Sequence, residues 1–123
     1  MENIEANKLI VKLQKDLAKS GIVKDNLVKG LQELRPFALA ENDPTLTKVI
    51  RLTYEHIAEN GTFNIPIPAD EAIVEGEEPE VMDMDDFDNK RDSLDYLLSL
   101  MLDRKNPTNQ LDLAEYRDML KNY

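Results

Sequence analysis

Apolar residues recur at helical spacing along most of the chain, and this pattern constrains the fold more than any other feature. Within residues 2–19 they fall on one stripe of a 3.6-residue period, formed by Ala6, Leu9, Ile10, Leu13 and Leu17. Ser20-Gly21 then provides a natural helix end, because glycine readily adopts the left-handed conformation that follows a last turn. An amphipathic helix of this kind buries its stripe against other helices. The pattern therefore predicts an all-α protein.

The clearest helix start lies at Asp43-Pro44. An aspartate before the first turn accepts hydrogen bonds from free backbone amides, and proline at the first helical position lacks only an N–H that would be unpaired anyway. Gly61 ends the apolar period that follows. We therefore expect a helix over residues 44–60.

Three more segments carry helical spacing, at about residues 22–35, 89–104 and 107–121. Pro36 predicts a kink or break after the first of them, because proline removes a backbone donor and disfavours helical geometry in the residue before it. Short connections between helices favour antiparallel neighbours. Together these features predict one helical domain over residues 1–123, a bundle of four to five helices.

An acidic insertion at about residues 62–88 separates the third and fourth expected helices. No Lys or Arg occurs between Arg51 and Lys90, so residues 52–89 carry a formal charge of −12 against −10 for the whole chain and +2 for the remainder. The twelve carboxylates are Glu55, Glu59, Asp70, Glu71, Glu75, Glu77, Glu78, Glu80, Asp83, Asp85, Asp86 and Asp88. Crowded like charges resist packing, so we expect the insertion to be largely non-helical. The acidity of this chain is local.

The insertion also holds too many apolar residues for a simple spacer, namely Phe63, Ile65, Ile67, Ile73, Val74, Val81, Met82, Met84 and Phe87. We expect some of them to dock on the bundle. A long connection inside a small helical domain is usually functional or disordered.

The leading functional hypothesis is a non-enzymatic interaction or adaptor module that binds a basic protein partner. Carboxylates would steer and select the partner, while flexible methionines and an aromatic side chain would anchor it. The residues assigned to this contact are Met82, Asp83, Met84, Asp85, Asp86, Phe87 and Asp88.

Three alternatives stay open. Rows of carboxylates could imitate phosphates, which would make the protein a nucleic-acid mimic that inhibits a DNA-binding protein. Paired carboxylates could also perform acid/base catalysis, although that chemistry needs a desolvated carboxyl group. The insertion could finally be a solvated loop without a binding role.

Calcium or magnesium binding by the aspartates fails a spacing test. An EF-hand loop needs oxygen ligands at positions 1, 3 and 5 and glycine at position 6. Counted from Asp83, position 5 is Phe87; counted from Asp86, it is Lys90. We expect no metal site and no cofactor.

Several activities are poorly supported by composition. The chain has no cysteine and one histidine, so thiolate chemistry and multi-histidine zinc sites are excluded, and no phosphate-binding glycine motif occurs. The net charge disfavours direct binding to nucleic acid or anionic lipid. No apolar run is long enough for a membrane span and no signal segment is recognisable, so a cytoplasmic location is expected. We therefore expect no enzyme.

Two further expectations concern His56 and the lysines of the first two helices. His56, on the third helix, is expected to be a half-exposed structural residue. The lysines of the first two helices are expected to form solvated faces, yet they could pair with the acidic insertion within one chain or across a homo-oligomer; they include Lys8, Lys12, Lys15, Lys24 and Lys29.

Overall fold

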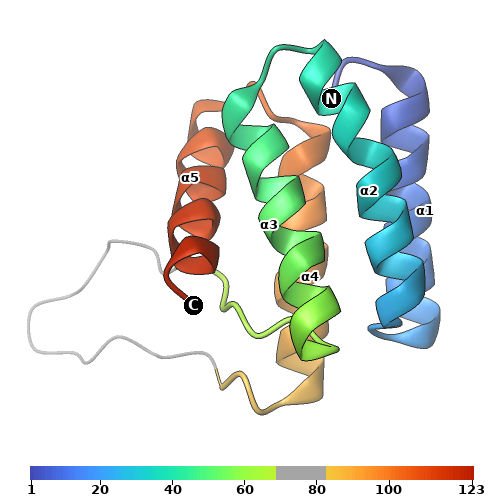
Figure 1. The fold of residues 1–123 in the computed structure, drawn as a ribbon, viewed down its shortest axis with the longest axis vertical. Coiled ribbons are helices and arrows are strands. Elements are labelled where there is room, and N and C mark those ends of the chain that lie inside the picture. Colours follow the sequence, from blue (N-terminus) through green and yellow to red (C-terminus); the bar gives the residue numbers. More distant parts are fainter. Residues whose placement is uncertain (69–82) are drawn as a thin grey trace, which may run out of the picture.

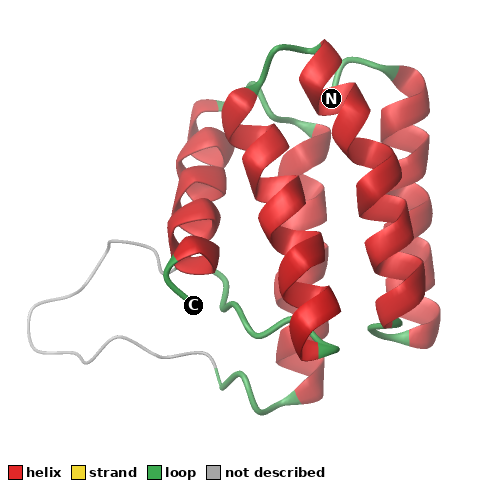
Figure 2. Cartoon of the chain, viewed as in Figure 1, coloured by secondary structure: helices red, strands yellow, loops and turns green. Residues whose placement is uncertain are grey.

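The computed structural model describes residues 1–68 and 83–123, and within them it contains only helices, turns and loops (Figure 2). The all-α prediction is confirmed. No helix in these two ranges is both long and apolar enough to cross a membrane. The helices are α1 (Ile4–Ser20), α2 (Lys24–Ala40), α3 (Pro44–Asn60), α4 (Phe87–Leu102) and α5 (Pro107–Lys121).

The five helices pack as a closed ring. The substantial interfaces join α1 to α2, α2 to α3, α3 to α5, α5 to α4 and α4 back to α1. Successive helices run up and down the bundle, so α3 and α5 are parallel neighbours (Figure 1). α3 and α4 follow one another in the chain but share no comparable interface. The prediction that their connection is largely non-helical falls mainly on residues 69–82, outside the described residues.

The sequence predicts a kink or break at Pro36. α2 continues through Pro36 to Ala40, so the predicted break is wrong. Proline inside a helix costs about 3 kcal/mol because one hydrogen bond is lost. Leu34 and Ala38 lie on either side of Pro36 and are fully buried. Burial of both residues favours helix continuation and offsets the local cost.

α1 and α2 approach each other closely at Gly30. A Cβ atom built at this position would lie 2.4 Å from Leu13 Cδ2 and 3.2 Å from Leu13 Cγ. Gly30 is buried, and Leu13 is 2% exposed in the core. The glycine therefore permits the contact between the two helices.

The segment after α3 fills the space between α3, α4 and α5. Phe63 and Ile65 are buried, which confirms that part of the insertion docks on the bundle. The buried hydroxyl of Ser93, on α4, donates a hydrogen bond to the Ile65 carbonyl at 2.6 Å and lies 3.0 Å from the hydroxyl of Tyr116, on α5. Burial raises the pKa of Tyr116. Its hydroxyl therefore stays protonated and donates to the Ser93 carbonyl at 3.1 Å.

His56 belongs to the same buried junction. The prediction of a half-exposed position is wrong, because His56 is buried and packs edge-on against the rings of Phe63 and Tyr123. Its Nε2 accepts a hydrogen bond from the backbone N–H of Asn64 at 3.0 Å. Burial lowers the pKa of His56. The neutral ring therefore holds the segment after α3 in place.

A mostly buried ion-pair cluster joins two turns at the opposite end of the bundle. Arg104, between α4 and α5, lies 3.0 Å from Glu41 Oε1 and 3.3 Å from Asp43 Oδ2, between α2 and α3. Burial alone would lower the pKa of Arg104, but its hydrogen bond to Glu41 and the nearby carboxylates raise it. The cluster fixes the two turns relative to each other.

Gly30→Ala is expected to lower the free energy of unfolding by about 1–3 kcal/mol, because the new methyl group overpacks the contact with Leu13. At an exposed position in a helix, replacing glycine with alanine would instead raise the free energy of unfolding by about 1 kcal/mol. Urea unfolding measures the difference. In a Leu13→Ala background the cost of the substitution should shrink, because the colliding atoms are gone. A stabilised Gly30→Ala protein would contradict the close approach.

Stability is expected to fall as pH is lowered below about 6.5, the ordinary pKa of histidine. The folded pKa of His56 is lower than that value, so the unfolded chain binds more protons in the intervening window. Urea unfolding at about pH 7.5 and about pH 5.5 measures the loss. His56→Gln, which keeps an acceptor for Asn64, should lose less over this range. An equal loss in both proteins would show that His56 is not responsible.

Candidate interaction site

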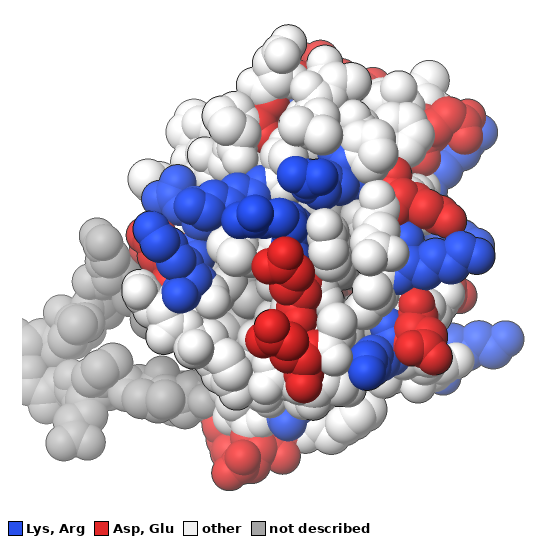
Figure 3. Space-filling view, in the orientation of Figure 1, with Lys and Arg blue, Asp and Glu red and all other residues white. Residues whose placement is uncertain are grey.

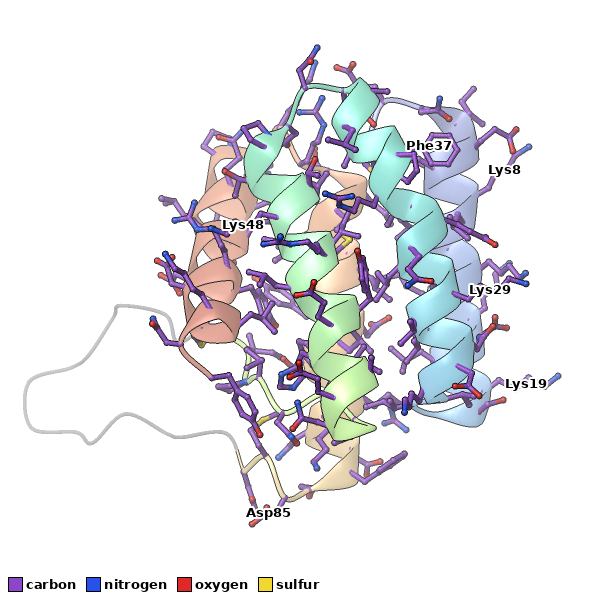
Figure 4. The ribbon with its side chains drawn as sticks, viewed as in Figure 1. Lys8, Lys19, Lys29, Phe37, Lys48 and Asp85 are labelled. Atoms are coloured by element: carbon purple, nitrogen blue, oxygen red, sulfur yellow. The ribbon has the colours of Figure 1, made fainter. Side chains whose placement is uncertain are left out.

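The assigned interaction residues lie at one end of the bundle, directly before and within the first turn of α4. We call residues 83–88 the acidic turn. Asp85 projects from this end in Figure 4, and acidic side chains gather at the same lower edge in Figure 3. Met82, which was assigned to the same contact, lies outside the described residues. The structure therefore brings six of the seven residues together.

The acidic turn is shaped by its own carboxylates. Asp83 Oδ1 accepts a hydrogen bond from the backbone N–H of Asp85 at 3.0 Å. Asp86 is the N-cap of α4, and its Oδ1 accepts from the N–H groups of Asp88 at 2.8 Å and Asn89 at 3.4 Å. α4 thus begins two residues before the predicted position. Asp86 has a structural role, because it satisfies amides that the helix leaves unpaired.

Most of the charge in the acidic turn is not compensated nearby. Asp88 pairs with Arg91 at 3.4 Å. Asp83, Asp85 and Asp86 are exposed and make no ion pair with any residue of 1–68 or 83–123. The N-terminal end of α4 carries a partial positive charge that favours carboxylates, but this effect is small in water. Three negative charges therefore remain available to a cationic partner.

Phe87 places an aromatic ring beside these carboxylates. It is 55% exposed, while the ring tip rests on the turn between α1 and α2. A Cβ atom added at Gly21 would lie 2.8 Å from Phe87 Cζ. Gly21 also has φ +72°, a conformation that side chains disfavour. Because Gly21 has no side chain, the tip of the Phe87 ring can lie against it. The rest of the ring faces solvent. Met84 is half-buried.

Sequence reasoning missed two features of this site. Asp86 followed by a helical segment is an N-cap signal, and it would have placed the start of α4 at Phe87. The contact between Phe87 and Gly21 has no signal in the sequence, because it joins positions far apart in the chain.

Two hollows lined by described residues contain carboxylates. A hollow of about 360 Å³ lies between α1 and α4, lined by Leu17, Ala18, Arg91, Asp92 and Asp95, of which the two aspartates are exposed. A second hollow, of about 270 Å³, lies between the first turns of α3 and α5. Its only carboxylate is Asp43, which is already paired with Arg104. Within the described residues no three His, Asp or Glu side chains converge as metal ligands would.

Comparisons with protein-family models, with curated proteins and with solved structures find no match to the chain.

Removal of the Asp86 side chain should destabilise the protein while loss of its neighbour does not. Asp86→Ala is expected to lower the free energy of unfolding by about 1 kcal/mol, because the N-cap of α4 is lost. Asp86→Asn should stay close to the parent, since asparagine caps equally well. Asp85→Ala, whose side chain caps no helix, is the control in urea unfolding. Equal losses for the alanine variants at positions 85 and 86 would contradict the capping role.

Proposed function

We propose that this protein is a small non-enzymatic interaction module that binds a basic segment of a partner protein through the acidic turn. The observation that carries the proposal is the set of three exposed carboxylates without a cationic neighbour, Asp83, Asp85 and Asp86. Phe87 lies directly beside them and is half-exposed. Carboxylates steer a basic partner toward the surface, and an aromatic side chain contributes contact area once it is bound.

The position of the acidic turn supports binding without large rearrangement. The acidic turn is continuous with α4. Further along α4, the buried Ser93 hydroxyl is bonded to the Ile65 carbonyl of the segment after α3. The ring of Phe87 is seated on Gly21. A surface held in this way loses little conformational freedom when a partner binds.

The proposal predicts that charge neutralisation in the acidic turn weakens partner capture by about tenfold, since exposed charge contacts contribute up to about 1 kcal/mol each. The wild-type chain serves as bait in lysate of its own cells, and mass spectrometry quantifies the recovered proteins. The test variant combines Asp83→Asn, Asp85→Asn and Asp86→Asn, because asparagine retains the turn and capping hydrogen bonds. Phe87→Ala should also weaken capture, without any change in charge.

A matched control separates local charge from net charge. The side chains of Glu33, Glu55 and Glu59 are exposed and make no hydrogen bond or ion pair with a residue in the described ranges. The control variant changes all three to glutamine and should retain capture. If the variant with the three aspartate substitutions captures the same basic proteins in the same amounts as the wild type, the proposal is overturned. Competition by duplex DNA for the captured partner would instead favour the nucleic-acid mimic.

A further inference from the structure

The outward face of α1 forms a shallow groove of about 470 Å³ with a mixed apolar and basic lining. Ile4 is 69% exposed and Val11 is 37% exposed. The buried side of α1 is formed by other residues, namely Ala6, Ile10, Leu13 and Leu17, so this face lies away from the core of the described bundle. The residues that line the groove are Ile4, Asn7, Lys8, Val11, Lys12 and Lys15.

The lysines of this groove have little compensation within the described residues. Lys8 lies 3.8 Å from Glu5, and both side chains are about 70% exposed, so their attraction is weak. Lys12 and Lys15 make no ion pair with residues 1–68 or 83–123. Seven helical positions separate Lys8 from Lys15, a distance of about 10 Å along the axis. The groove therefore presents three cations in a row beside two apolar side chains.

The acidic turn is complementary in charge to the groove on α1 and extends over a similar length. It presents three unpaired carboxylates and one half-exposed ring, and the three residue steps from Asp83 to Asp86 span at most about 10 Å. Lys8 and Asp85 lie at different ends of the bundle (Figure 4). Because each patch faces outward at its own position, a contact between Asp85 and Lys8 requires two molecules.

We propose that the groove on α1 receives the acidic turn of a second copy of this chain. In this contact Phe87 packs between Ile4 and Val11, and the carboxylates of the turn face the lysines. The inference rests on the proposed function in one respect, namely that the acidic turn binds basic surfaces. It adds that one such surface belongs to the protein itself.

Local charge supports a second copy as the occupant, because the acidic turn places exposed carboxylates beside Phe87 and the groove places lysines beside Ile4 and Val11. Each copy carries −10 overall, which opposes association at long range, so the contact depends on local charge. The part outside residues 52–89 carries +2, so the acidic turn of one copy approaches a slightly positive scaffold on the other. The two contacting surfaces differ, so the contact is either reciprocated across a two-fold axis in a dimer or repeated head-to-tail along a chain of copies.

The test is a charge swap followed by sedimentation over a concentration series. The wild-type protein should show a mass that rises with concentration. One variant, Lys12→Glu with Lys15→Glu, has two acidic surfaces, and another, Asp83→Lys with Asp85→Lys, has two basic surfaces. Each variant alone should remain monomeric. An equimolar mixture should associate again, because each turn then meets a surface of opposite charge.

A control variant, Lys24→Glu with Lys29→Glu on α2, makes the same change in net charge at exposed positions and should associate as the wild type does. Phe87→Ala should weaken association by about tenfold while net charge stays constant. Circular dichroism and thermal unfolding confirm that every variant is folded.

Three results would overturn the inference: a wild-type protein that stays monomeric at every concentration, a mixture that fails to associate, or a control that behaves like the groove variant. The lysine-to-glutamate groove variant retains the acidic turn, so its capture of basic proteins from lysate tests the proposed function separately. A monomeric wild-type protein whose turn still captures a basic partner would refute self-association and leave the proposed function standing.

Discussion

The hydrogen bond from the buried Ser93 hydroxyl to the Ile65 carbonyl ties the segment after α3 to the middle of α4. α3 and α4 share no substantial interface, although both pack against α5. Phe63 and Ile65 fill the space between the helices, and His56 accepts a bond from the next backbone amide. A buried backbone group without such a partner would cost about 1–3 kcal/mol. The junction fixes the segment that follows α3 against α4 and α5.

The two ends of the bundle differ in whether their carboxylates are paired with a cation. The cluster around Arg104 compensates its own carboxylates in a largely buried site and stabilises one end of the bundle. At the other end, the acidic turn leaves carboxylates exposed beside an aromatic ring. Ion pairs of the first kind contribute to the fold, since their partners are fixed. Unpaired surface charges contribute little to stability and are available for recognition.

Much of the candidate site could be anticipated from the sequence, and the remainder could not. The acidic and apolar composition of residues 82–88 is visible in the sequence. The contacts that each aspartate makes depend on the folded geometry. Asp86 caps a helix, Asp88 pairs with Arg91, and Asp85 does neither. The burial of His56 was also not predictable, because its neighbours Phe63 and Tyr123 reach it only in the folded chain.

The sequence by itself determined the helices, since apolar periodicity and caps such as Asp43 act within a few residues. Tertiary structure decided the order in which the helices pack, the passage of α2 through Pro36, and the seat of Phe87 on Gly21. These features depend on packing between distant positions, which can outweigh a local preference of a few kcal/mol. Local caps mark where several of these helices begin, whereas packing decided where α2 ends and which helices are neighbours.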